Sequence, residues 1–455
     1  MRTPILGSLR NRFQRFFQLV DVDRAVFYGI ATRIWSTGAG PLTALLVAVR
    51  FSREVQGYYY TFSSIVALQV FAELGLGVVI LNFASHEWTH LELDVEGRVI
   101  GDPAALSRLR SIVRIAAKWF GAGAVVVALG LSVVGYRFFV SGTDYGVSWP
   151  APWVALSVFV ALNISLVPIW SLLEGCNQVR QLYTFRFFQG VLTGSATWLA
   201  IFAGAKLWTA VISGVVGFLW AVAFILRKYR GFFGSLWVKS TNGPRVHWRS
   251  DMVPMQWRIA VSWISGYIVF SLFTPVLFKY RGAIVAGQMG MTLSLMGLLA
   301  FGTAWLSPKI PMFGMLIAQG SFQELDRLFW RVTRIVFVST IALAGAVFVL
   351  VCMLGLYWPL LAARVLPLTP TVLFLGAQIL FVSSTPFSAY LRAHKREPLM
   401  AISVTTAILV GGSTVLLGKH YGAMGMAVGF LAVNVLVYPV ILLKWQRCRV
   451  IWHAR

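Results

Sequence analysis

Apolar stretches recur along the whole chain and are separated by short polar segments. Each stretch has about 17–25 residues, the length that an α-helix needs to cross the hydrocarbon core of a bilayer. A soluble domain would instead alternate apolar and polar positions with a helical or strand period. The pattern predicts twelve spanning helices, at residues 28–49, 58–82, 115–136, 153–173, 184–204, 207–226, 259–278, 284–307, 335–357, 371–391, 399–417 and 422–443.

The basic residues predict how these helices are oriented. If the N-terminus is cytoplasmic, the segments on that side hold 30 of the 39 Lys and Arg residues, and the segments on the other side hold 8. Loops rich in Lys and Arg remain on the cytoplasmic side of a membrane. We therefore expect an even number of helices and both termini in the cytoplasm.

The segments between the predicted spans are short. Residues 5–20 alternate Arg with Leu and Phe at helical spacing, which predicts a helix lying on the membrane surface. Residues 102–118 begin with Asp102 as a helix N-cap and Pro103 at the first helical position, which predicts an amphipathic helix leading into the third span. The longest loops, all expected to be cytoplasmic, are 83–114, 227–258 and 308–334.

Composition agrees with a membrane protein and excludes several other classes. Only 12% of the residues are charged, against roughly 25% in soluble domains, and 58% are hydrophobic. The net charge of +24 lies between apolar stretches, where it suits anionic lipid head groups rather than nucleic acid. The cysteines Cys176, Cys352 and Cys448 are scattered, so neither disulfides nor a metal site is expected. No phosphate-binding glycine loop occurs, and we expect no cofactor and no enzymatic activity.

The two halves of the chain repeat several features in the same order. The segment Arg33-Ile34 opens the first span and Arg258-Ile259 the seventh; the pairs Gly57 with Phe71 and Gly287 with Phe301 are each fourteen residues apart. Further counterparts are Pro168 and Pro386, Glu174 and Arg392, and Gly217 and Gly429. Six helices per half would relate the lobes by an axis along the membrane normal. The expected organisation is an interfacial segment 1–27, a six-helix lobe 28–226, a basic linker 227–258, a second six-helix lobe 259–443 and a tail 444–455.

Several segments resemble a known family. They are GYYYTFSSIVALQVFAELGLGVVILNFASHE (57–87), LLEGCNQV (172–179), MQWRIAVSWISGYIVFSLFTPVLFKYRGAIVAGQMGMTLSL (255–295) and YLRAHKREPL (390–399). In these segments the chain resembles the polysaccharide-biosynthesis and O-antigen-type oligosaccharide flippases. That family lies in the multidrug/oligosaccharidyl-lipid/polysaccharide exporter superfamily, and the resemblance extends over about residues 25–445.

The resemblance implies both an architecture and a substrate. The expected fold is an all-α polytopic membrane protein with about twelve transmembrane helices in two six-helix lobes around a central cavity. The expected activity is alternating-access transport of an oligosaccharide carried on undecaprenyl pyrophosphate, and the expected location is the bacterial inner membrane. Membrane lipids, a glycan polymerase and glycosyltransferases are the implied partners, and nucleic acid is not one of them.

Ionisable groups inside spans are costly, so they are candidates for function. Arg33, Arg258 and Arg392 are the predicted substrate-binding residues, because the planar guanidinium donates paired hydrogen bonds to phosphate and stays charged. Glu73 could hold Arg33 in place or exchange a coupling proton, and Glu174 is the counterpart of Arg392. The alternative is structural: Arg33 extends its charge to the interface, Glu73 is its partner, and the groups at span ends are ordinary interfacial residues.

The segment HEWTH at 86–90 matches the His-Glu-x-x-His pattern of zinc proteases. On a helix, His86 and His90 would share a face, with Glu87 as a general base and Glu92, Asp94 or Glu96 as a third ligand. The motif lies where the second span is expected to end, so an interfacial helix terminus is favoured over an intramembrane zinc protease.

Two other functions remain open. A cation-coupled multidrug exporter of the same superfamily would need acidic residues in its cavity, and only Glu73 lies well inside a span. A glycosyltransferase or polymerase would need larger external loops with acidic residues than this chain has.

Overall fold

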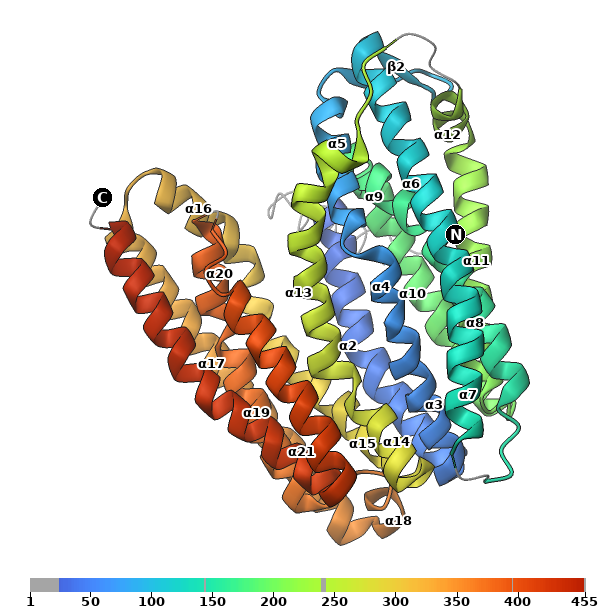
Figure 1. Ribbon diagram of the computed structural model, residues 1–455, viewed down its shortest axis with the longest axis vertical. Helices are drawn as coiled ribbons and strands as arrows, with labels where there is room; N and C mark the ends of the chain where they lie inside the picture. The colour runs from blue at the N-terminus through green and yellow to red at the C-terminus, as the bar shows by residue number, and fades with distance from the viewer. Residues whose placement is uncertain (1–23, 143–144, 239–242, 395, 454–455) are drawn as a thin grey trace, which may run out of the picture.

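The computed structural model describes residues 24–142, 145–238, 243–394 and 396–453. The helices form two lobes that touch at one end and diverge toward the other (Figure 1). The predicted surface helix at residues 5–20 lies outside the described residues. Within the described residues the fold is all-α apart from one small hairpin, in agreement with the predicted fold class.

The first lobe is built from spans that are often broken into two or three helical pieces. A two-stranded antiparallel hairpin, β1 (Leu91–Leu93) and β2 (Val99–Gly101), follows its second span. The helices are α2 (Arg24–Arg50), α3 (Arg53–Val66), a 3₁₀ turn (Ala67–Gln69), α4 (Val70–Glu73), α5 (Leu76–Trp88), α6 (Pro103–Gly130), a π-helical turn (Leu131–Gly135), α7 (Tyr136–Val140), α8 (Pro150–Ser165), α9 (Val167–Gly175), α10 (Val179–Phe202), α11 (Trp208–Lys228) and α12 (Arg230–Trp237).

The second lobe follows the same plan. Its last helix contains Gly422 in a left-handed conformation, φ 61°, which divides it into two spans. The pieces are a π-helical turn (Trp248–Met252), α13 (Val253–Ser271), α14 (Phe273–Arg281), α15 (Ala283–Met296), two 3₁₀ segments (Gly297–Trp305 and Ser307–Lys309), α16 (Ile310–Ala318), α17 (Phe322–Tyr357), α18 (Pro359–Ala362), α19 (Leu368–Ser383), α20 (Thr385–Ala393) and α21 (Met400–His453).

The predicted number of spans agrees with the structure. Within the described ranges, seven helices are long and apolar enough to cross a membrane, and two pairs bent by 44° and 41° bring the number to nine. The long helices α2 and α10 and the division of α21 account for the other three. The fold class with about twelve helices in two lobes is therefore confirmed.

The predicted loops are more structured than the sequence suggested. Asp102 caps α6 as predicted, because its carboxylate accepts a hydrogen bond from the Ala105 backbone N–H at 2.8 Å. The segment 83–114 also contains the hairpin β1–β2, which hydropathy did not predict. The segment 308–334 is mostly helical, since α17 begins at Phe322, well before the apolar span.

The two lobes repeat each other's helix breaks. Both α3 and α15 are 14 residues long, have their glycines Gly57 and Gly287 at the fifth position, and continue into 3₁₀ geometry. A single residue separates α8 from α9 and α19 from α20, and Pro168 and Pro386 follow these breaks in the first turn of α9 and α20. The breaks support the duplication inferred from the spacing of single residues.

The lobes meet where α3 crosses α15, at what we call the joined end. Gln56 is buried there: its amide donates hydrogen bonds to the carbonyl oxygens of Gly287 and Arg364, both at 3.0 Å, and accepts one from the Arg364 guanidinium at 3.3 Å. The ring of Phe278 on α14 also packs against that of Tyr58 in the first lobe, with 4.9 Å between the ring centroids. The opposite end carries β1, β2, α12 and the start of α17, and we call it the basic end (Figure 1).

Candidate functional site

A cavity of about 720 Å³ opens between the lobes toward the basic end, and we call it the mouth cavity. The first lobe contributes two apolar side chains of α5, and the second lobe contributes α13 and the residues that follow α20. Its lining consists of Val78, Phe83, Asp251, Pro254, Met255, Arg258, Ile259, Ser262, Trp263, Arg392 and Glu397.

Two of the three predicted substrate-binding arginines lie in this cavity. Arg258 is exposed and its guanidinium lies 5.7 Å from the ring centroid of Trp257, and no carboxylate of a described residue lies within ion-pair distance of it. Arg392 contacts Glu397 at 3.5 Å, and more than half of each side chain is exposed to solvent. Exposed pairs of this kind contribute little to stability, so both guanidinium groups are available to an anion.

The lining is less positive than the sequence suggested, because two carboxylates share it. Asp251 accepts hydrogen bonds from the Ser250 hydroxyl at 2.6 Å and from the His247 backbone at 2.8 Å, which hold it in place. Glu397 is the partner of Arg392. The cavity therefore holds two positive and two negative groups, of which only Arg392 and Glu397 form an ion pair, and Arg258 has no carboxylate partner among the described residues.

A second space of about 380 Å³, the inner chamber, lies among α13, α19, α20 and α21. It shares Ser262 and Arg392 with the mouth cavity, so the two spaces adjoin. Hydroxyl, phenol and amide groups reach it from three directions, and no Asp or Glu lines it. Those groups belong to Ser262, Ser265, Ser384, Thr385, Ser388, Ser403, Thr406, Tyr438 and Asn434.

The second span is broken at the point where the lobes approach each other. Leu74 and Gly75 both adopt left-handed backbone conformations, φ 44° and 71°, and separate α4 from α5. Ile259 of α13 lies so close to Gly75 that a Cβ at that position would overlap its side chain. On the other side, the Trp119 indole donates a hydrogen bond to the Ala72 carbonyl oxygen at 2.8 Å. Such broken helices expose backbone groups that ligands or waters can bind.

Arg33 and Glu73 are not brought together. Arg33 is exposed on α2, and Glu73 is partly buried at the last position of α4. Neither belongs to an ion pair within 4 Å among the described residues, and neither lines the mouth cavity. The bend of the second span explains the difference, because depths estimated along two straight helices do not apply to a span bent by 44°.

Glu174 has a local partner. Its carboxylate accepts a hydrogen bond from the Arg186 guanidinium at 3.0 Å, across the turn between α9 and α10. Both side chains are partly exposed. This pair favours the structural interpretation of Glu174 that the sequence left open.

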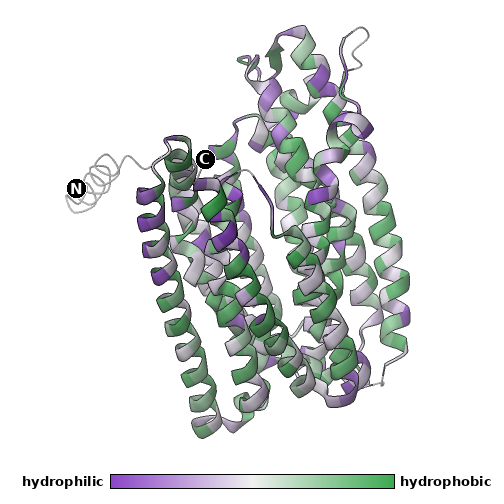
Figure 2. Ribbon diagram, turned by 60° about the vertical axis from the view of Figure 1, so that its left-hand side comes forward, coloured by the Kyte–Doolittle hydropathy of each residue, from purple (hydrophilic) through white to green (hydrophobic). Residues whose placement is uncertain are grey.

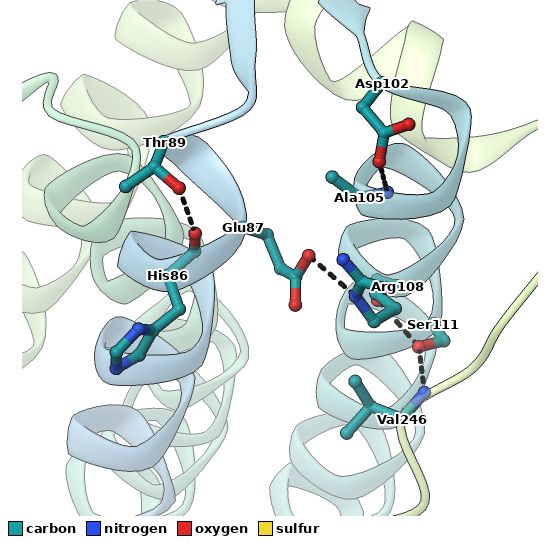
Figure 3. Close-up of polar contacts among 8 residues, drawn as sticks. All are labelled: His86, Glu87, Thr89, Asp102, Ala105, Arg108, Ser111 and Val246. Carbon is teal, nitrogen blue, oxygen red and sulfur yellow. Dashed lines mark hydrogen bonds and ion pairs between the residues drawn. The ribbon is translucent and has the colours of Figure 1, made fainter.

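The motif HEWTH closes a helix, and its groups point in different directions (Figure 3). Glu87 accepts a hydrogen bond from the Arg108 guanidinium of α6 at 2.8 Å, whereas the His86 imidazole is directed away from it. His90 lies beyond the C-cap Thr89, outside the helix. No group of three His, Cys, Asp or Glu side chains suited to a metal occurs within the part of the chain that the structure describes.

We predict that Glu87 stabilises the protein and does not hold a metal. Glu87→Gln removes a partly buried ion pair. It should lower the free energy of unfolding by about 1 kcal/mol, which is measured as a fall in the melting temperature of the purified protein. Treatment with a strong chelator should leave the melting temperature of the wild type unchanged. Stoichiometric zinc in the purified protein, lost together with stability on chelation, would contradict this assignment.

Sequence reasoning did not identify the groups of the inner chamber. They are neutral, and only ionisable residues had been singled out. A signal was present in their spacing: Ser262 and Ser265, Ser384 and Ser388, and Ser403 and Thr406 are three or four residues apart within apolar stretches of the sequence. Polar positions at this spacing share a helix face. A search for polar stripes in otherwise apolar spans would have found them.

Comparison with known proteins establishes the fold. No protein-family model matches the chain, and no curated protein matches it in sequence. Among solved structures, it is similar to the lipid II flippase MurJ in an inward closed conformation, with a TM-score of 0.61 and 11% identity over 92% of this chain and 87% of that one.

Two structures of a multidrug resistance MATE family transporter of the MOP superfamily are also similar. The inward-facing one has a TM-score of 0.55 and 14% identity over 93% of this chain and 95% of that one. The outward-facing one has a TM-score of 0.51 and 13% identity over 95% of this chain and 96% of that one. The chain thus has the two-lobed fold of these transporters, and at such identities the likeness extends to the fold alone.

Proposed function

We propose that this chain is a transporter of the bacterial inner membrane that flips a lipid-linked oligosaccharide by alternating access. In this proposal the basic end faces the cytoplasm and both termini are cytoplasmic. The observation that carries the proposal is the mouth cavity, where Arg258 and Arg392 adjoin a chamber lined by hydroxyl groups.

The two spaces suit the two parts of such a substrate. A pyrophosphate would bind the guanidinium groups of Arg258 and Arg392, each of which donates paired hydrogen bonds to phosphate oxygens. Sugar hydroxyls would bind the serine, threonine and asparagine side chains of the inner chamber, since these groups both donate and accept hydrogen bonds. The polyprenyl tail would remain in the bilayer, where the exposed apolar faces of the helices lie.

The remaining predicted residues have roles in the same proposal. Arg33 would contact the substrate in a conformation in which α2 faces the cavity. Glu73 would act as a coupling group, because it lies beside the break at Leu74 and Gly75, where the second span contacts α13. Glu174 would hold the turn between α9 and α10 through Arg186.

The arginines provide the test. In proteoliposomes, Arg258→Gln combined with Arg392→Gln should lower the rate of flipping of an undecaprenyl-pyrophosphate oligosaccharide at least tenfold, since each charge-assisted contact is worth about 1.5–3 kcal/mol. The control is Arg227→Gln combined with Arg230→Gln, which removes two exposed arginines that line neither the mouth cavity nor the inner chamber and should leave the rate unchanged. Equal rates in the double variant and the wild type would disprove the proposal.

A cation-coupled multidrug exporter is the second candidate, favoured by the likeness to the MATE family transporters. It would place organic cations in a chamber that no carboxylate lines, where nothing compensates their charge. Expression in a pump-deficient strain decides between the two. Resistance to cationic drugs that is lost in Glu73→Gln would support export of drugs instead of lipid-linked sugars.

A further inference from the structure

Four arginines gather on the outer side of the second lobe, and none of them lines the mouth cavity. Three of them, Arg327, Arg331 and Arg334, follow one another at helical spacing on α17, and Arg449 faces them from the end of α21. Together with Asp326, Trp330 and Ile335 they line a hollow of about 610 Å³. We call these seven residues the arginine patch.

The single carboxylate of the patch is already engaged. Asp326 accepts two hydrogen bonds from the Arg449 guanidinium, at 3.0 and 2.6 Å, and one from the Tyr390 hydroxyl at 3.1 Å. Arg327, Arg331 and Arg334 are exposed and belong to no ion pair among the described residues. The patch therefore holds three arginines without an ion-pair partner among the described residues, and the nearest other carboxylate on α17 is Glu324, three residues before Arg327.

This spacing is unfavourable for the helix itself. Like charges three or four residues apart repel each other on a helix surface. The third span begins differently, because the arginines of α6 are occupied: Arg108 binds Glu87, Arg110 binds the Ser235 carbonyl oxygen, and Arg114 binds that of Val238. The arginines of α17 have no hydrogen-bond or ion-pair partner of this kind in the part of the chain that the structure describes, so an external anion is the partner that would relieve their repulsion.

The surroundings identify the kind of anion. The opposite face of α17 is buried by the lobe through Leu325, Phe329, Val332 and Val336, so the patch faces away from the protein. From Ile335, the last patch residue on α17, the same helix face continues as an apolar surface toward the C-terminal end of the span. Ile335, Val338 and Ile341 on this face are 41%, 64% and 44% exposed. The second lobe is accordingly hydrophobic along most of its length and hydrophilic near the end that carries the C-terminus (Figure 2). Trp330 lies among the arginines, and indoles are enriched at membrane interfaces.

We propose that the arginine patch binds the phosphate head group of an anionic phospholipid of the surrounding bilayer. The acyl chains lie along the apolar face below, and the phosphate bridges Arg331 and Arg334. Basic pockets between membrane helices at the cytoplasmic interface bind anionic head groups in this way. The site is separate from the mouth cavity, so it does not depend on the proposed substrate.

The test is the binding of dioleoyl phosphatidylglycerol to the purified full-length protein. Binding is measured by native mass spectrometry and by the rise in the protein's melting temperature when the lipid is added. Arg331→Gln with Arg334→Gln should weaken binding about 25-fold, since each arginine near a charged interface contributes about fivefold. Arg227→Gln with Arg230→Gln is the matched control, because it removes two exposed arginines at the same end of the molecule and should leave binding unchanged. Arg331→Lys with Arg334→Lys should retain most of the affinity, because both positive charges remain. The melting temperature without added lipid shows whether each double variant folds.

Three outcomes would overturn the proposal. Equal loss in the control pair would mean that only the overall charge attracts the lipid. Full competition by millimolar inorganic phosphate would assign the patch to a free anion. Binding of poly-glutamate with no binding of phosphatidylglycerol would assign it to an acidic protein partner.

Discussion

Gly57→Ala should strongly destabilise the contact between the lobes, because there is no space for a methyl group where α3 crosses α15. A Cβ on Gly57 would overlap the carbonyl oxygen of Ala283 and lie 2.9 Å from its Cα. Both are backbone atoms, so no side-chain rotation relieves the clash, and the helices must separate. Forcing extra volume into a packed contact costs about 1–3 kcal/mol. The melting temperature of the purified protein in detergent should fall accordingly.

A graded series separates this contact from general effects on helices. Gly287→Ala should have a smaller effect in the same direction, since its Cβ would lie 2.9 Å from the Gly57 nitrogen and 3.1 Å from its Cα. Gly121→Ala, on α6, has no neighbour within 4 Å and should be neutral or slightly stabilising, because alanine favours helices. Equal shifts in all three variants would show that the crossing of α3 and α15 is not the cause.

The joined end shows how the duplication shapes the molecule. Gly57 and Gly287 occupy the same position in repeated helices and contact each other across the two lobes. Contact between equivalent positions is expected on or near a pseudo-two-fold axis. The pair was recognisable in the sequence as a repeated spacing, but its role required the structure, because spacing alone does not show which helices touch.

The fold followed from the sequence because the bilayer imposes strong constraints. Spans must be long, apolar and hydrogen-bonded within themselves, so hydropathy and the distribution of Lys and Arg suffice to count them. Helix ends outside the membrane obey weaker rules. The capping of α6 by Asp102 was predictable from local residues, but the hairpin β1–β2 and the early start of α17 were not, since no apolar period marks them.

The site was less accessible to sequence reasoning. The cost of burying charge led to Arg258 and Arg392, which the structure places in one cavity, but it could not reveal that Asp251 and Glu397 share that cavity. It also suggested that Arg33 and Glu73 could pair, which assumed straight helices. The break at Leu74 and Gly75 depends on contacts with Trp119 and Ile259, which are distant in sequence.

Trp153→Ala should destabilise the first lobe more than any other substitution considered for this protein. The indole is fully buried, packs 4.8 Å from the ring of Phe62 and 5.2 Å from that of Phe139, and donates a hydrogen bond to the Leu131 carbonyl oxygen at 2.9 Å. That carbonyl belongs to the π-helical turn between α6 and α7. Loss of a buried tryptophan costs about 3–5 kcal/mol. Thermal unfolding followed by circular dichroism measures the effect.

Gly135 makes this prediction sharper, because a Cβ there would overlap the ring of Trp153. Gly135→Ala alone should cost about 1–3 kcal/mol, since the ring is held by its neighbours and cannot move aside. In the Trp153→Ala background the same change should cost almost nothing, because the ring is gone and the new methyl group fills part of the cavity. The coupling energy between the two sites should therefore reach about 1 kcal/mol or more. Gly130→Ala is the control, because a Cβ at Gly130 would have no neighbour within 4 Å. Its effect on the free energy of unfolding should be the same with and without Trp153. If Gly135→Ala were equally costly with and without Trp153, the packing of this ring against the π-helical turn would not be what stabilises the lobe.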